Sequence, residues 1–186
     1  MGKNILLVLL IVLMINIKPV FAADKVAGPS ASLDAVESTE NMDSFVDRFV
    51  KIKVITEVLT KYNSPLLGEV DGFMEACEKN DIDCYLLPSI TGLESSFGRF
   101  TYPSSHNPFG WGGGYIMFSS WSEGFDKVGY GLKKNYIGRG ATTIEQIGPI
   151  YAESPTWAQR VRHFHSEFEK VEAENNTYFR RLALEI

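Results

Sequence analysis

Residues that commonly carry metal or redox chemistry are scarce in this chain, which has two cysteines and three histidines among its 186 residues. No histidine lies near Cys77 or Cys84 in the sequence, which argues against a zinc-type metal site. His163 and His165 are two positions apart in an expected helix, so their side chains point to different sides. We therefore expect neither a metal ion nor another cofactor.

Positive charge is also in short supply. The chain has 18 lysines and arginines against 23 aspartates and glutamates, for a formal net charge of −5. Proteins that bind nucleic acid need a basic face to neutralise phosphates. The composition thus argues against nucleic acid as a partner.

The sequence has no apolar run of the roughly 20 residues that a membrane-spanning helix needs. Its main apolar run, Ile5–Ile15, follows Lys3 and is followed by small residues at Val20 and Ala22. This pattern is typical of a secretory signal peptide over residues 1–22. An uncleaved N-terminal anchor is the alternative, and it is the one membrane contact that we expect. In both cases the rest of the chain is exported, either secreted or held in the periplasm or cell wall.

Composition divides the exported part into three segments. Residues 23–43 are small, polar and acidic with no apolar period, which is typical of a disordered linker. Residues 44–175 suit one compact domain, and residues 176–186 are expected to form a helical tail. Cleavage after residue 22 would remove Lys3 and Lys18 and lower the formal net charge from −5 to −7. With no internal repeat present, we expect a monomer.

Strand patterns are weak, whereas apolar residues recur at helical spacing in several segments. This spacing predicts helices over residues 45–61, 69–79, 83–97 and 121–135. A short helix is expected to open with the capping pattern Thr142–Glu145 and to end near Pro149. A long helix is expected to begin at Ser154 and Pro155. Residues 98–119 are rich in glycine and proline, and Tyr115–Phe118 could form a short strand. The predicted fold class is mainly α, with a small irregular or β-hairpin lobe beside a cleft.

The two cysteines allow one disulfide. Cys77 and Cys84 would lie outside the cytoplasm, where disulfides persist. A bridge between them would tie the end of one expected helix to the start of the next, and closing so short a loop is worth about 2–3 kcal/mol. Two buried thiols are the alternative, and the spacing leaves both open.

Glu94 is the strongest candidate for a catalytic residue. It follows Ile90 by four residues and Leu87 by seven, so it is expected to point close to the apolar face of its helix. A carboxyl group in that position is expected to be desolvated, which favours its protonated form. This is the condition for a general acid that must still carry its proton near neutral pH.

The segment after Glu94 has no aspartate or glutamate between Ser95 and Ser122. Trp111 lies in its glycine-rich part, which favours a platform for a sugar ring. Trp121 and Trp157 instead sit on apolar helix stripes and are expected to belong to the core. Ser104, Ser105 and His106 suggest a serine nucleophile, but the Gly-x-Ser-x-Gly elbow is absent.

Three stretches carry a family likeness: the runs Leu87–Gly98 (LPSITGLESSFG), Asn107–Trp111 (NPFGW) and Tyr151–Ala158 (YAESPTWA). In this order and spacing the chain resembles the lysozyme superfamily, and within it the glucosaminidase-like domains of glycoside hydrolase family 73. The likeness covers roughly residues 50–170.

The resemblance implies an α+β, lysozyme-like fold and cleavage of the β-1,4 glycan strand of peptidoglycan. It implies that Glu94 is the catalytic acid and that Tyr151 lies near the reacting sugar. The cleft residues that it implies are Phe97, Ser105, Asn107, Phe109 and Trp111.

One departure concerns the second carboxylate that most glycosidases use. The lobe after Glu94 has none, and the nearest candidates are Glu123, Asp126, Glu145 and Glu153. Either one of these serves, or the acetamido group of the sugar assists, or Glu94 acts alone as in lytic transglycosylation. A non-catalytic wall-binding module and an enzyme that acts on N-glycans of glycoproteins are the remaining alternatives.

Overall fold

The computed structural model describes the backbone of residues 30–184 and the side chains of residues 43–176. The predicted signal peptide, residues 1–22, and the first part of the predicted linker lie outside the described residues. The chain divides into two units between residues 40 and 41, and the residues considered for function all lie in the second. In the part of the chain that is described, no helix combines the length and apolarity required to cross a membrane.

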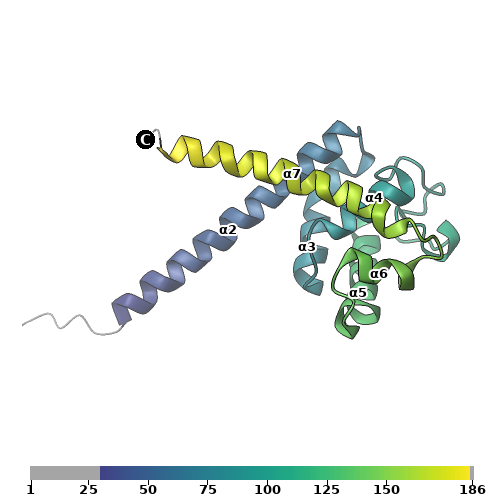
Figure 1. Cartoon of the computed structure of the whole chain (residues 1–186), viewed down its shortest axis with the longest axis horizontal. Coiled ribbons are helices and arrows are strands. Elements are labelled where there is room, and N and C mark those ends of the chain that lie inside the picture. Colours follow the sequence, from purple (N-terminus) through teal and green to yellow (C-terminus); the bar gives the residue numbers. More distant parts are fainter. Residues whose placement is uncertain (1–29, 185–186) are drawn as a thin grey trace, which may run out of the picture. The chain divides into compact units, whose positions relative to one another are not determined.

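The fold is mainly α, with no strand among residues 30–184 (Figure 1). The helices are α2 (Ser30–Lys61), α3 (Val70–Asn80), α4 (Leu86–Ser95), α5 (Trp121–Asn135), α6 (Ile144–Tyr151) and α7 (Trp157–Leu184). Three short 3₁₀ helices connect them, at η1 (Pro65–Glu69), η2 (Trp111–Gly114) and η3 (Ile137–Arg139).

Two expectations about the ends of the domain need correction. Residues 30–43, expected as part of a disordered linker, form the first part of α2. The expected C-terminal tail is helical, but it is the continuation of α7 and not a separate element. Both long helices thus run across the segment boundaries that composition suggested, because composition does not mark where a helix stops.

The expected strand at Tyr115–Phe118 is absent, so the lobe after α4 is irregular and contains no hairpin. Gly112, Gly113 and Gly114 have positive φ angles of 60°, 67° and 85°, which turn the chain before an extended segment can begin. The backbone of Phe118 donates one hydrogen bond to the Ser105 carbonyl, at 2.8 Å, and no second strand lies beside it within the described residues.

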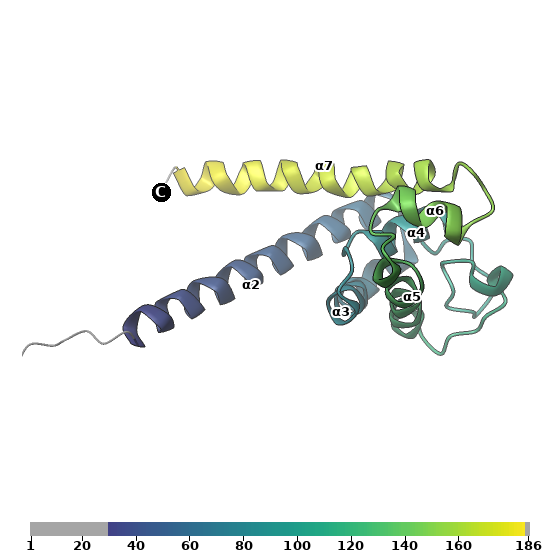
Figure 2. The same cartoon turned by 60° about the horizontal axis from the view of Figure 1, so that its bottom comes forward.

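The core forms where two pairs of helices meet. α3 packs against α5, and α4 packs against α7, which also contacts α6 (Figure 2). Phe73 and Phe125 stack across the first pair with ring centroids 3.9 Å apart. The apolar stripe predicted for α3 is buried, namely Val70, Phe73, Met74 and Cys77. Helical periodicity therefore identified the inward faces correctly.

The capping residues of α5 and α6 differ in detail from the predicted patterns. Ser120 caps α5 as expected, but the carboxylate of Glu123 accepts from the backbone and hydroxyl of Ser119. The capping box of α6 uses Thr143 and Gln146, one residue later than predicted, and α6 passes through Pro149 to end at Tyr151. Glu145, which was predicted to take part in the capping box, instead forms an ion pair with Arg162 of α7.

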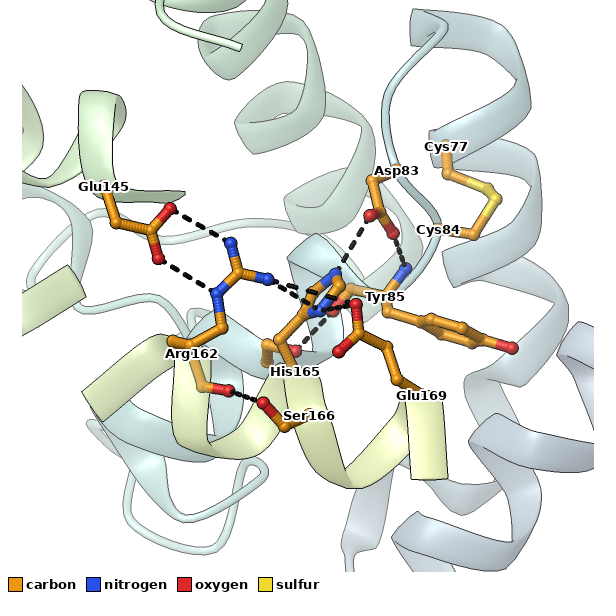
Figure 3. A network of polar contacts seen from close by, with 10 residues as sticks. Cys77, Asp83, Cys84, Tyr85, Glu145, Arg162, His165, Ser166 and Glu169 are labelled. Atoms are coloured by element: carbon orange, nitrogen blue, oxygen red, sulfur yellow. Dashed lines mark hydrogen bonds and ion pairs between the residues drawn. A yellow bond between two sulfur atoms is a disulfide. The ribbon is translucent and has the colours of Figure 1, made fainter. Parts of the chain in front are cut away.

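Several contacts fix the start of α4. Cys77 and Cys84 form a disulfide that ties the end of α3 to the segment before α4. An Asp83 oxygen accepts from the Tyr85 backbone at 2.7 Å, and its second oxygen lies 2.9 Å from Nε2 of His165 on α7 (Figure 3). Pro88 occupies the first turn, where its missing N–H removes no helical hydrogen bond. α4 is thereby anchored to both α3 and α7.

Candidate active site

Glu94 lies in the last turn of α4, opposite the first residue of α7. Its Oε1 atom accepts a hydrogen bond of 2.8 Å from the indole Nε1 of Trp157. Its side chain is exposed, so the desolvation expected from its apolar neighbours does not occur in this structure. Glu94 was expected close to the apolar face of its helix, but the core ends with Trp157 and does not extend over the carboxylate.

The chain makes a sharp left-handed turn directly after Glu94. Ser96, Phe97 and Gly98 have consecutive φ angles of 51°, 58° and 81°, and the first two are uncommon for residues with a side chain. The Phe97 backbone donates to the Thr91 carbonyl at 2.9 Å, which closes the helix end. The turn reverses the chain so that the following loop returns toward the carboxylate.

Ser95 joins the end of α4 to that loop. Its hydroxyl is buried, donates to the Pro108 carbonyl at 2.8 Å and accepts from the Gly98 backbone at 2.9 Å. The loop then passes close to the carboxylate at Gly110, where an added Cβ would lie 3.6 Å from the second oxygen of Glu94. The segment Asn107–Trp111 is therefore held beside Glu94 by the helix end itself.

Asn107 shapes this segment from inside. Its side-chain oxygen accepts from the Trp111 backbone at 3.2 Å, and its amide donates to the carbonyls of Trp111 and Ile116 at 2.9 and 3.2 Å. The side chain is 2 % exposed, so the amide is used to order the loop and does not face solvent.

Trp111 and Tyr151 are joined by a hydrogen bond between their side chains. The indole Nε1 of Trp111 donates to the Tyr151 hydroxyl at 2.9 Å. The far edge of the same indole rests on Gly131 of α5, where a Cβ would lie 2.3 Å from the ring, so only glycine leaves room for it. The Tyr151 ring in turn packs on Trp157 with centroids 4.6 Å apart.

These contacts form one continuous group, which we call the Glu94 cluster: Glu94, Trp157, Tyr151 and Trp111. Its members come from α4, α7, α6 and the loop, respectively. Polar atoms alternate with aromatic faces along it, from the carboxylate to the two indole N–H groups and the phenol. Three of the four were predicted site residues, and the fold brings these three together.

The phenol of Tyr151 is neutral at physiological pH. Burial raises the pKa of Tyr151 well above its usual value, and the nearby charge of Glu94 adds to this rise, whereas the hydrogen bond from Trp111 opposes it. Because the hydroxyl oxygen already accepts from Trp111, its proton remains available for a hydrogen bond to another acceptor.

Four predicted cleft residues do not face solvent. Phe97 is fully buried and packs on Tyr62, with centroids 4.5 Å apart, and Phe109 is 2 % exposed and packs edge-on against Phe125. Ser105 and Asn107 are buried within the loop. All four support the loop and the core, and their assignment to a cleft surface is corrected here.

Trp157 is the site residue that sequence reasoning assigned to a different role. It was expected in the core and is 3 % exposed, yet its N–H group bonds Glu94. The signal in the sequence was chemical, because a buried indole N–H needs an acceptor. Trp121, also expected in the core, is half-buried and packs edge-on against His106.

Most candidates for a second carboxylate are already engaged elsewhere. Glu123 accepts from Ser119, Asp126 pairs with Lys79 and Glu145 pairs with Arg162. Glu153 is exposed in the connection between α6 and α7, two residues after Tyr151. Within residues 43–176, no group of three or more His, Cys, Asp or Glu side chains could hold a metal ion.

Comparison with protein-family models and with curated proteins found no match for this chain. The chemistry of the Glu94 cluster is accordingly the basis on which a function can be proposed.

Proposed function

We propose that the protein is a glycosidase that cleaves the β-1,4 glycan strand of peptidoglycan, with Glu94 as general acid. The observation that carries this proposal is the Glu94 cluster, in which an exposed carboxylate held by Trp157 adjoins two further aromatic residues. A single acid beside flat aromatic surface matches the chemistry of sugar binding and of glycosidic bond cleavage.

In the first step, Glu94 donates its proton to the glycosidic oxygen as the bond from this oxygen to the anomeric carbon breaks. The sugar passes through an oxocarbenium-like state, and Glu94 becomes a carboxylate. The Trp157 N–H then stabilises the negative charge, since a hydrogen bond to an ionised acceptor is stronger than one to a neutral acceptor. A glycan lying over the exposed side of Glu94 would exclude water from it during this step.

Tyr151 and Trp111 would position the sugar. The neutral Tyr151 hydroxyl can donate to a sugar oxygen while it accepts from Trp111. The same loop exposes Tyr102 and Tyr115, whose rings lie 5.6 Å apart. Exposed tyrosine rings suit stacking against the apolar faces of sugar rings.

The sequence likeness to the glucosaminidase-like domains supports the same reaction. Its three matching stretches contain all four residues of the Glu94 cluster. Peptidoglycan lies outside the cytoplasm, and the signal-peptide pattern over residues 1–22 is consistent with export. The proposal includes a lysozyme-like arrangement of the helices.

Lytic transglycosylation is the second candidate, and one observation favours it. Glu123, Asp126 and Glu145 are engaged elsewhere, which leaves Glu153 as the remaining candidate for a second carboxylate. If Glu153 takes no part, the Glu94 carboxylate would remove the proton from the sugar's own 6-hydroxyl. That oxygen would bond the anomeric carbon, giving a 1,6-anhydro end and returning the proton to Glu94.

The test is digestion of purified peptidoglycan by the full chain and by its Glu94→Gln and Glu153→Gln variants. Products are identified by mass spectrometry. Loss of products with Glu94→Gln is expected. If the wild type leaves hydrated N-acetylglucosamine ends and Glu153→Gln no longer does, the protein is a two-carboxylate glucosaminidase. If the wild type leaves 1,6-anhydro ends and Glu153→Gln still does, the protein is a lytic transglycosylase.

Other results would overturn the proposal. Binding to peptidoglycan without any cleavage by the wild type would establish a non-catalytic wall-binding module. Release of N-glycans from a glycoprotein, with intact peptidoglycan left uncut, would replace the substrate. Undiminished cleavage by Glu94→Gln would exclude Glu94 as the acid.

A further inference from the structure

The lysines and arginines of residues 43–176 fall into two groups. Those that form salt bridges are Arg48, Lys51, Lys53, Lys61, Lys79, Lys133, Arg162 and Lys170. Those that form none within the described residues are Arg99, Lys127, Lys134, Arg139 and Arg160, and all five are exposed. We call these five the unpaired cations. Each lies in a segment that contains or adjoins a member of the Glu94 cluster.

Two unpaired cations lie on α5, beside the contact with Trp111. The Trp111 indole rests on Gly131. Lys127 is four residues before this glycine and Lys134 is three residues after it, and residues at these spacings are neighbours on a helix surface. Lys134 also lies over the exposed ring of Tyr130, with its Nζ 5.4 Å from the ring centroid. The part of α5 that supports Trp111 is therefore bordered by positive charge.

Arg139 and Arg160 adjoin two other members of the cluster. The Arg139 backbone donates to the Tyr136 carbonyl at 2.9 Å, and the Tyr136 ring lies 5.8 Å from the ring of Tyr151. Arg160 follows Trp157 by three residues on α7, so the two are neighbours on the helix surface. Positive charge is thus placed beside Tyr151 and Trp157 as well.

The segments around the cluster are also poor in negative charge. Between Ser95 and Ser122 there is no aspartate or glutamate, and Arg99 is the one lysine or arginine. Its guanidinium lies over the Phe100 ring, 5.6 Å from the centroid. Residues 127–144 have no aspartate or glutamate either. These two segments carry a formal charge of +5, from Arg99, Lys127, Lys133, Lys134 and Arg139, whereas the whole chain carries −5.

A single exposed lysine without a partner is ordinary, because surface ion pairs add little stability. The distribution is informative, since the cations remote from the cluster have a carboxylate neighbour and the unpaired cations occur only around it. An uneven charge distribution of this kind attracts ligands of the opposite sign and raises their association rate. The site is therefore suited to an anionic ligand, although the chain as a whole is acidic.

The kind of anion is limited by two further features. The Glu94 cluster contributes aromatic surface, which suits uncharged sugar rings. Glu94 is exposed, and so is Glu153 between Tyr151 and Trp157, so a ligand with negative charge along its whole length would meet repulsion. A ligand that combines uncharged rings with separate carboxylates avoids this repulsion. Peptidoglycan has that composition, because its glycan strand bears short peptides with free carboxylates.

We propose that the unpaired cations bind the peptide carboxylates of a glycan strand whose sugars lie on the Glu94 cluster. The site thereby selects strands that still carry their peptides over bare glycan. This inference rests on the proposed function and names a part of the substrate that the proposed function leaves open. The five cations contact the peptides and not the reacting atoms, so they contribute to binding and are not catalytic residues.

The test compares two forms of the same soluble, uncrosslinked peptidoglycan strands, one with free carboxylates and one with its carboxylates converted to methylamides. Binding to the full-length Glu94→Gln variant is measured by isothermal titration, so that cleavage does not interfere. The free-carboxylate strands should bind at least about tenfold more tightly at low salt, since each exposed ion pair is worth a factor of about 1.5 to 5. This preference should disappear at about 0.5 M salt, which screens exposed charges.

Single charge removals in the same variant locate the effect. Lys134→Gln and Arg139→Gln should each weaken binding of the free-carboxylate strands by about twofold to fivefold and leave binding of the methylamide strands unchanged. Lys170→Gln is the matched control, because it makes the same charge change about 20 Å along α7 from Trp157, where Lys170 pairs with Glu174. It should leave both affinities unchanged. Circular dichroism verifies that each variant is folded.

Three results would overturn the inference. They are equal binding of the two strand forms at low salt, equal weakening by Lys134→Gln and Lys170→Gln, and binding of a single-stranded DNA oligonucleotide as tight as that of the free-carboxylate strands. The second result would mean that only the net charge of the chain matters, and the third that the cations form a general polyanion surface.

The proposed function is tested by a different readout, which is the products that the wild type releases. Cleavage of peptidoglycan together with equal binding of the two strand forms would remove this inference and leave the proposed function standing. A preference for free carboxylates without any cleavage by the wild type would remove the proposed function and leave a binding surface for peptide-bearing strands.

Discussion

The two ends of α4 differ in almost every respect. Its first end is tied down by the Cys77–Cys84 disulfide and by the contact between Asp83 and His165. Its last end carries Glu94 in an exposed position, held by one hydrogen bond from Trp157. One helix thus has an anchored end and a presenting end, and both are attached to α7.

The difference suggests why a short helix can carry a candidate catalytic group. Between the two ends, Leu87 and Ile90 are fully buried, so α4 cannot rotate without exposing apolar surface. Packing fixes the direction of the helix, and the anchored end fixes its position along α7. The helix therefore holds Glu94 in a fixed position while its side chain remains exposed to a substrate.

The largest expected effect is at the presenting end. Glu94→Gln should lower the release of soluble products from peptidoglycan by about 10²–10⁴-fold, because the general acid is lost. The amide has the shape of the carboxyl group and can still accept from Trp157. The free energy of unfolding of the Glu94→Gln variant, measured in urea, should therefore stay within about 0.5 kcal/mol of the wild-type value. A variant that loses activity only by unfolding would contradict this division of roles.

The next largest effect is expected at the anchored end. Reduction of the Cys77–Cys84 disulfide should lower the free energy of unfolding by about 2–3 kcal/mol, since the closed loop restricts the unfolded chain. Urea denaturation with and without a reductant measures the change. In a Cys77→Ser, Cys84→Ser variant the reductant should have no further effect. An unchanged midpoint for the wild type would show that packing alone holds this end.

Trp157 tests the link between the presenting end and α7. Trp157→Phe keeps an aromatic ring but removes the N–H donor to Glu94, and we expect about a tenfold loss of activity from the lost charge-assisted bond. Trp121→Phe is the control, since Trp121 packs on His106 and is not part of the Glu94 cluster. Rates are compared on folded protein at a temperature where both variants are stable. Equal losses in the two variants would argue that Trp157 acts only through packing.

The smallest effect concerns the pH dependence of the anchored end. Burial by itself would raise the pKa of Asp83, but the hydrogen bond and charge of His165 outweigh it, so this pKa lies below its usual value. The stabilisation is therefore present above the unfolded-state pKa of about 3.9 and is lost as pH falls through the lower, folded-state value. Because Asp83 is half-exposed, the contribution should be about 1 kcal/mol at most.

Asp83→Asn removes this charge and keeps a similar shape. The difference in unfolding free energy between wild type and variant should be present at about pH 5 and should shrink below about pH 4. Activity at neutral pH should be unchanged, because Asp83 contacts none of the Glu94 cluster. A difference that grows as pH falls would mean that the charge of Asp83 destabilises the native state.

The sequence by itself determined the helical class and the inward faces of the helices. Apolar side chains at helical spacing must be buried together, and this requirement can be read from a single chain. It also predicted Glu94, Trp111 and Tyr151 as site residues, and the fold connects these three through Trp157. Glycines at positions 112 to 114 were visible as a loop signal, although the strand predicted after them does not form.

Only the tertiary structure decided how far along α4 the core extends. Periodicity gives the side of a helix that faces inward, but the covering element determines which turns are enclosed. In the last turn of α4, Ser95 is buried but Glu94 is exposed opposite the start of α7, whereas Phe97 turns back into the core. The pairing of Trp157 with Glu94, and of Trp111 with Tyr151, likewise depends on contacts between residues 40 or more positions apart, which no local pattern encodes.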